Sequence, residues 1–304
     1  MIDFLHNNLA YLINGISVGG QYALIAIGYT MVYGILRLIN FAHGDVFMVA
    51  GLMMVYISTM LPIGVTIPVV LILTALLGFL IERAAYRPLR SAPRMSVMIS
   101  AIGVSYLLQN CALYFTGGLP QTFPKVSWLA KTVDIWGTSV MVAKLITPPL
   151  TILLIVVLLF LIKKTKVGMA MRAVSKDFEI SQLMGVRINT VISITFIIGC
   201  FLAAVGSILY FTCYPSIQPT SGGMPGLKAF VSAVFGGIGS IPGAVIGAFI
   251  IGIFENIIKG GASIFGIESN GWTTFSDAFS FALLIIILMV KPTGIFGEKS
   301  TDKV

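Results

Sequence analysis

The sequence predicts an all-α polytopic integral membrane protein with about eight transmembrane segments, built as a single domain over residues 1–304. Hydrophobic residues make up 57% of the chain and charged residues only 10%, whereas soluble domains carry about 25% charged residues. So few charges cannot cover a water-soluble body of this length, and so much apolar surface is incompatible with a disordered chain. Long uncharged stretches between charged loops agree with this class, because about 20 apolar residues cross a bilayer.

The expected spans are bounded by charged residues or by proline and glycine. They cover residues 4–36, 46–61, 65–81, 95–116, 145–162, 190–212, 229–254 and 275–290. The opening Met1-Ile2-Asp3 offers no basic n-region, and the apolar stretch that follows is longer than the core of a signal peptide. We therefore expect the first span to be retained rather than cleaved.

Two interruptions divide the apolar pattern, near residues 37–45 and within the glycine-rich segment 236–243. Irregular backbone at membrane depth is tolerated only where it faces protein or a water-filled cavity. Interrupted segments in corresponding positions of two halves are typical of transporters whose pathway lies at the breaks. No convincing residue-level repeat accompanies them, so this interpretation depends on the placement of the breaks alone.

Positive charge predicts which loops are cytoplasmic. The loops 82–94 and 163–187 and the tail after residue 290 together hold 13 of the 19 basic residues, and such residues concentrate in cytoplasmic loops. The 117–144 loop is then outside. For the tail to end inside, residues 227–258 must enter the membrane from the outside and return, with their turn at 236–243.

The same sequence argues against several classes of function. A net charge of +8 would suggest nucleic acid as the partner of a soluble protein, but here the charge belongs to loops beside membrane lipid, so no nucleic-acid partner is expected. Cys111, Cys200 and Cys213 lack metal-ligand spacing, and no metal site is expected. Without a GxSxG, HExxH or P-loop motif, the chain is expected to be neither an enzyme nor an ATPase. No series of intramembrane charges supports an ion relay, although backbone carbonyls leave sodium coupling open.

Candidate pathway residues are the polar and small groups at the breaks and inside the fourth span: Asn40, His43, Gly44, Asp45, Gln109, Asn110, Gly236, Gly237, Gly239 and Gly243. The first four either form an interfacial turn, with Asn40 or Asp45 capping a helix, or line the translocation path. Gln109 and Asn110 need polar partners inside a span, either on another helix or in a solute path. The glycines either permit close helix packing or form a turn that exposes backbone to a cavity.

The cytoplasmic loop of about 163–190 is expected to be ordered. Residues 170–184 contain no proline or glycine, and Met171 and Val174 begin an apolar repeat at helical spacing. This pattern predicts a short amphipathic helix that stops at Gly185. Such a helix could lie on lipid headgroups, pack back on the bundle or dock into a groove of a cytoplasmic partner.

Four motifs occur in order along the chain: YALIAIGYTMVYG with INFAHGD within 22–45, RAxxxDxxxxxxxGV from 172, GGIGSIPGA from 236 and KPTGIFG from 291. Together, over about residues 14–297, they resemble the LivH/LivM family of permeases of branched-chain amino-acid ABC importers. The resemblance implies a permease of the bacterial inner membrane that translocates branched-chain amino acids. Urea or short amides are the alternative substrates, and a stand-alone channel for small neutral solutes is the alternative class.

The resemblance also implies partners and residue roles. A LivM-type second permease, two cytoplasmic ABC ATPase subunits and a periplasmic substrate-binding protein would complete the transporter. ATP and Mg²⁺ would be used by the ATPases, and this chain would bind no cofactor. The residues that would engage an ATPase are Arg172, Ala173, Asp177, Phe178, Glu179, Ser181 and Gly185. Ser181 departs from the alanine usual in the family, but a small residue is kept.

Overall fold

The computed structural model describes residues 2–90, 92–135, 138–264, 270–291 and 293–297. Its helices are α1 (Ile2–Leu36), α2 (His43–Ile57), α3 (Ile63–Ile81), the π-helical η1 (Glu82–Tyr86), α4 (Arg94–Thr116), α5 (Val142–Lys164), α6 (Lys166–Lys176), α7 (Phe178–Leu183), α8 (Ile188–Cys213), α9 (Gly223–Gly236), α10 (Ile241–Ile264) and α11 (Asn270–Val290). Four short strands form two antiparallel pairs: β1 (Gln121–Thr122) with β4 (Ser216–Ile217), and β2 (Thr132–Ile135) with β3 (Thr138–Met141).

The prediction of an all-α polytopic membrane protein is confirmed. Six helical segments are long and apolar enough to cross a membrane: Ala10–Leu36, Ile63–Tyr86, Arg94–Thr116, Val142–Lys164, Ile188–Cys213 and Ile241–Gly260. The shorter apolar helices are α2 and the Ser276–Val290 part of α11, so eight apolar helices lie within the described residues. Both predicted interruptions are present as well, because α1 ends at Leu36 and α9 ends at Gly236.

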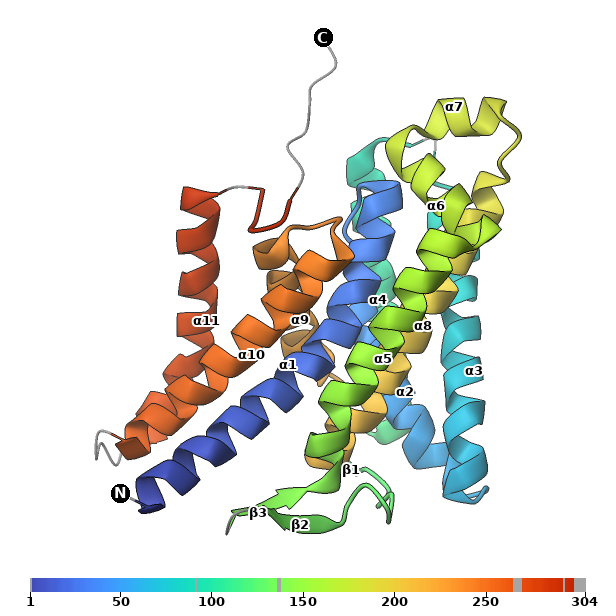
Figure 1. Cartoon of the computed structure of the whole chain (residues 1–304). Coiled ribbons are helices and arrows are strands. Elements are labelled where there is room, and N and C mark those ends of the chain that lie inside the picture. Colours follow the sequence, from blue (N-terminus) through green and yellow to red (C-terminus); the bar gives the residue numbers. More distant parts are fainter. Residues whose placement is uncertain (1, 91, 136–137, 265–269, 292, 298–304) are drawn as a thin grey trace.

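The elements are arranged between two distinct ends, seen in Figure 1. Helices α6 and α7 lie at one end, and the β2–β3 hairpin lies at the other, together with the start of α1. We call the first the inner end and the second the outer end, because positive charge predicts that the loop with α6 and α7 is cytoplasmic. The basic loop 82–94 is also at the inner end, because Arg90 and Arg94 share a cavity with Phe178 of α7. The loops that positive charge assigns to the cytoplasm therefore lie together.

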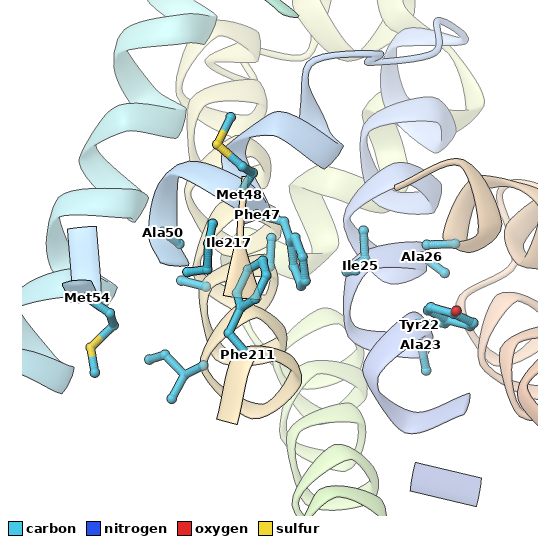
Figure 2. Packing of buried hydrophobic residues seen from close by; sticks show 14 of the residues in the cluster. Tyr22, Ala23, Ile25, Ala26, Phe47, Met48, Ala50, Met54, Phe211 and Ile217 are labelled. Carbon is cyan, nitrogen blue, oxygen red and sulfur yellow. The ribbon is translucent and has the colours of Figure 1, made fainter. Parts of the chain in front are cut away.

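Helices α1 and α8 form the centre of the molecule. The apolar stretch of each is 67% buried, against 22%, 17% and 22% for those of α3, α4 and α5. Small residues bring α1 onto α10, since a Cβ on Gly15 would lie only 2.8 Å from the Cα of Ile253. In the core seen in Figure 2, the rings of Phe47 on α2 and Phe211 on α8 have centroids 5.3 Å apart.

Two half-length helices, α2 and α9, begin beside each other in the middle of the molecule. His43 opens α2 against Gly199, near the midpoint of α8, and a Cβ there would lie 3.6 Å from the imidazole Cε1. At the start of α9, a Cβ on Gly226 would lie 2.8 Å from the Cα of Gly44. From this junction α2 runs toward the outer end. Helix α3 then returns from the outer end to the inner loop 82–94. Helix α9 runs inward and ends beside the C-terminal tail.

The segment 236–243 is a tight turn at the inner end that joins α9 to α10. Gly237 and Gly239 have φ values of 108° and 98° there, a region that only glycine enters without strain. The tail covers this turn, since the backbone N–H of Ile295 donates to the carbonyl of Phe235 at 3.0 Å. Residues 227–258 thus run in and back out, as the charge distribution required.

A further interruption, at residues 214–222, was not predicted, because these residues fall between the expected spans 190–212 and 229–254 and were taken as a connecting loop. Strand β4 does pair with β1 at the outer end, but the chain then returns to Gly44 before α9 begins. Residues 214–222 are uncharged and include two prolines. A return of such an irregular segment into the membrane produces neither a helical period nor a hydropathy peak, so the sequence offered no signal for it.

Candidate functional site

The first break is packed among helices rather than exposed at an interface. The Asn40 side-chain carbonyl accepts a hydrogen bond from the Tyr86 hydroxyl at 2.7 Å, and both residues are buried. The buried His43 ring meets Tyr29 edge-on, with centroids 5.0 Å apart. The N-cap of α2 makes no side-chain hydrogen bond, so neither Asn40 nor Asp45 caps this helix. The break is held by tertiary contacts with α1 and η1.

Asp45 lies in the first turn of α2 and is bound by two polar residues of α4. Its carboxylate accepts from the Ser105 hydroxyl at 2.5 Å and from the Gln109 amide at 3.0 Å. Asn110 lies elsewhere, because it is exposed and donates to the carbonyl of Tyr106 on its own helix at 2.8 Å. Ser105 was not singled out from sequence, although its i, i+4 spacing with Gln109 inside an apolar span was an available signal.

A second polar site joins α1, α9, α10 and α11. Lys228 lies 2.7 Å from the carboxylates of both Glu255 and Asp277, and Lys259 lies 2.5 Å from Glu255. The hydroxyl of Tyr22 also donates to Glu255, at 3.1 Å. Lys228 and Glu255 are buried. Two positive and two negative groups therefore form a neutral cluster, which lowers the cost of holding charge inside the membrane.

This charge cluster corrects the expectation that the spans contain no series of charged residues. The expected spans stopped at residue 254 and resumed at 275, which placed Glu255 and Lys259 in a loop. Instead α10 continues to Ile264 and α11 already begins at Asn270. The available signal was the i, i+4 spacing of Glu255 and Lys259, which allows mutual neutralisation on one helix face.

A partly buried ion pair also stabilises the inner loop 82–94. Glu82 is fully buried, and its carboxylate binds Arg90 and accepts from the Ser193 hydroxyl at 2.7 Å. Arg90 also donates to Asn189, so α8 is tied to the loop twice. Partial burial lowers the pKa of the Arg90 guanidinium, and the adjacent Glu82 carboxylate opposes that shift.

A cavity of about 300 Å³ lies at the inner end, between the end of α1, this loop, the start of α4 and α7. Its lining includes Arg37, Arg90 and Arg94 together with Phe178. Arg37 has a φ of 54°, an unusual value for a residue with a side chain. The cavity therefore brings Phe178, a predicted ATPase-engaging residue, to the chain segment that begins the first break.

The loop 163–190 is ordered, but the single helix expected over 170–184 is divided into α6 and α7. Asp177 divides them by ending α6 and capping α7, where its carboxylate accepts from the N–H of Ile180 at 3.0 Å. Gly185 stops α7 with a φ of 83°, and the next N–H, that of Val186, donates to the carbonyl of Ser181 at 3.1 Å. This bond is typical of a glycine C-cap.

The two helices of this loop face different surroundings. On α6, Met171 and Val174 are buried against the bundle. On α7, Ile180 and Leu183 are 56% and 87% exposed, and Met184, the residue that follows its last turn, is 80% exposed. Among the predicted ATPase-engaging residues, Arg172, Phe178, Glu179 and Gly185 are exposed, Ala173 and Asp177 are half-buried and Ser181 is buried. The sequence predicted the exposed apolar residues as part of one helical repeat with Met171 and Val174 and left open which surface they contact; the structure divides the repeat into a buried part on α6 and an exposed part on α7.

The glycine turn at 236–243 lies close to α6. A cavity of about 130 Å³ between them is lined by Thr30, Arg172 and Gly239 among others. Gly236 and Gly243 contact each other so closely that a Cβ on either would overlap the backbone of the other. Close packing therefore explains this pair, whereas Gly239 has open space beside it.

Comparison with known proteins identifies the family. Residues 11–288 match the family model described as "Branched-chain amino acid transport system / permease component". The chain belongs to this family. It is 39% identical to the high-affinity branched-chain amino acid transport system permease protein LivH of Salmonella typhimurium, over 97% of each chain. It is 37% identical to the corresponding BraD protein of Pseudomonas aeruginosa, over 99% of each chain, and 28% identical to the ribose import permease protein RbsC of Haemophilus influenzae, over 78% and 73%.

Family membership and the apolar helices together establish a multi-pass transport permease of the inner membrane. The predicted family, fold and location are thereby confirmed. The match extends over both breaks, the loop 163–190 and the glycine turn. The two polar sites and the two inner cavities therefore belong to the permease domain of a transport system.

Proposed function

We propose that the chain is the permease subunit of an ABC importer that translocates branched-chain amino acids across the bacterial inner membrane. The observation that carries the proposal is similarity over nearly the full length to LivH and BraD, both named as branched-chain amino acid permeases. A LivM-type second permease would complete the pathway. Two cytoplasmic ATPases would supply the energy, and a periplasmic binding protein would deliver the solute.

The exposed apolar face of α7 supports docking of a cytoplasmic ATPase. Leu183 and Met184 project from the inner end with 87% and 80% of their surface exposed, and short helices with such anchors bind in hydrophobic grooves. A passive channel would need no such element. The chain itself carries no P-loop, so ATP and Mg²⁺ would be bound and used by the ATPase, with no catalytic role or cofactor in this subunit.

The cavities beside α6 and α7 are also lined by the segments that connect to the half-helices α2 and α9. Phe178 shares the larger cavity with Arg37, which begins the first break, and Arg172 shares the smaller one with Gly239 of the glycine turn. Displacement of α6 and α7 by the ATPases would act on the segment before α2 and on the turn after α9. ATP must bind one arrangement more tightly than the other, because equal affinity would shift no population.

Transport in reconstituted vesicles tests the proposal. With the binding protein outside and ATP inside, we expect leucine to accumulate, and we expect accumulation to stop when a non-hydrolysable analogue replaces ATP. Parallel assays with urea, acetamide and ribose test the substrate, since RbsC shows that related permeases are named for other solutes. Leucine entry at an undiminished rate without ATP would favour a channel, and accumulation of urea alone would replace the substrate class.

Docking of the ATPase is tested by substituting the exposed residues of α7. We expect Leu183→Gln combined with Met184→Gln to reduce recovery of the ATPase with the permease at least fivefold. Met289→Gln, at the inner end of α11 and 81% exposed, is the matched control. Asp177 is unsuitable for this test, because its substitution would also remove the cap of α7. Full recovery of the ATPase with the double variant would refute docking through α7.

A further inference from the structure

Helices α3, α4 and α5 are exposed to a similar extent, yet α4 differs in composition. Their apolar stretches are 22%, 17% and 22% buried, and that of α4 is much the least hydrophobic of the three. In the middle of α5 the large exposed residues are all apolar: Ile152, Leu153, Val156, Val157 and Phe160. Such a surface suits lipid hydrocarbon, which offers no partner to polar groups.

The outward side of α4 carries a stripe of mixed character, formed by Ile99, Gly103, Tyr106, Asn110 and Tyr114. The first four recur every three or four residues, on the side opposite the buried Val97 and Ala101. No atom of the described residues lies within 4 Å of a Cβ placed on Gly103, so the stripe has a gap at this position. The small Gly103 beside the amide of Asn110 and the phenol of Tyr106 forms a surface that suits packing of another helix rather than contact with lipid.

The polar part of this α4 stripe lies at membrane depth. Tyr106 is ten residues from the end of α4 at Thr116, or about 15 Å at 1.5 Å per residue, and Asn110 is about 9 Å from it. Only one bond of Asn110 is made within its own helix, to the carbonyl of Tyr106. Exposure of the other N–H group and the carbonyl oxygen of this amide to hydrocarbon is unfavourable. Protein or water therefore covers this face in the working assembly.

We propose that the α4 stripe is the surface on which the second permease subunit packs. This inference rests on the proposed function, in which a second permease completes the pathway. The stripe is continuous with the Asp45 cluster, because Gln109, which binds Asp45, lies on its flank. Among the described elements, α4 contacts mainly α2 and η1, which leaves its other side exposed for a partner. A partner helix there would contact small and polar groups and would cover the Asp45 cluster on the side of α4 that faces away from this chain.

Spin labels at matched positions test this interface. In a chain whose three cysteines are replaced (Cys111→Ser, Cys200→Ala and Cys213→Ala), one label is placed through Tyr106→Cys and another through Ile152→Cys. Both sites are exposed, 62% and 54%, and each is ten residues from the outer end of its helix. Accessibility to dissolved oxygen is measured by electron paramagnetic resonance in vesicles with the chain alone and with the complete transporter.

We expect assembly to lower oxygen accessibility at least threefold at position 106 and to leave position 152 unchanged. Unchanged accessibility at 106 in a transporter that still takes up solute with ATP would overturn the interface and leave the proposed function standing. Dipolar broadening between labels on two copies of this chain would overturn the second permease as occupant in favour of a second copy. Failure of any ATPase to associate or drive uptake would overturn the proposed function and this inference together.

Discussion

Helices α2 and α9 begin at the same junction but are held there by different chemistry. Near the start of α2, a single carboxylate, Asp45, is bound by neutral donors, Ser105 and Gln109, on an outlying helix. In α9, Lys228 is bound by Glu255 and Asp277, within a cluster that balances its own charge. The first arrangement loses only one neutral donor when a partner is removed, whereas the second acquires a net buried charge when one of its charged members is removed. We therefore expect the α9 side to determine stability and the α2 side to be more tolerant.

The largest effect is expected from Glu255→Gln, which breaks the cluster at the residue that binds both lysines and Tyr22. Removing one partner of a buried ion pair costs about 3–5 kcal/mol, so we expect a large fall in thermal stability in detergent and little protein in the membrane. Lys259→Met is the control, because Lys259 is 38% exposed and binds only at the edge of the cluster. Equal stability of the Glu255→Gln and parent proteins would contradict a structural role for the cluster.

The sequence predicted one of these sites and missed the other, for a physical reason. Asp45 lies beside a visible break, so it was recognised, but its partners are 60 and 64 residues away and only the fold brings them together. Lys228 and Glu255 were taken as the borders of the expected span 229–254, and Asp277 near the start of the span 275–290 was not connected with them, since each charge counts against insertion when taken alone. Mutual neutralisation allows such residues to remain inside a helix bundle, and that depends on tertiary contacts.

The helices and the inner end were predicted more fully than the junction between the half-helices. Apolar length and basic loops suffice for spans and orientation, because both reflect transfer between water and lipid. The division of the expected 170–184 helix at Asp177 was missed, although an Asp three residues before Ile180 is a capping position. The start of α9 beside Gly44 could not be predicted, since contact between two glycine backbones leaves no periodic pattern.

A smaller loss of stability is expected from Gly226→Ala, which disturbs the contact between the start of α9 and the start of α2. The added methyl would lie 2.8 Å from the Cα of Gly44 and would push α2 and α9 apart. Overpacking of this kind costs about 1–3 kcal/mol, measurable as a lower midpoint of thermal denaturation. Gly223→Ala is the matched control on the same helix, because nothing lies within 4 Å of its added carbon. Identical midpoints for the two variants would show that the half-helices do not depend on this contact.

The Asp45 site on α2 is tested by Asp45→Asn, where we expect a still smaller loss of stability, about 1–2 kcal/mol, from weakened hydrogen bonds. The amide keeps the shape of the carboxylate but removes its charge and half of its acceptor capacity. Normal abundance in the membrane with solute uptake reduced at least tenfold would place Asp45 in the transport function. Gln109→Leu removes one donor and should have a milder effect of the same kind. Loss of Asp45→Asn protein from the membrane would instead give α2 the structural role that we assign to α9.

The smallest change in stability is expected from His43→Leu, at the first residue of α2. Its Nε2 atom is buried and has no hydrogen-bond partner within the described part of the chain. Leucine, an apolar side chain of similar size, removes this unsatisfied polar group, which favours the folded state. It also removes the edge contact of the imidazole with Tyr29, which disfavours it. These two changes oppose each other, and we expect the thermal midpoint to move by less than that of Asp45→Asn. If uptake nevertheless falls, the imidazole acts in transport rather than in packing, and His43→Gln, which restores a polar group, should recover part of the rate. Unchanged uptake by His43→Leu would remove His43 from the pathway and leave Asp45 as the functional residue at the start of α2.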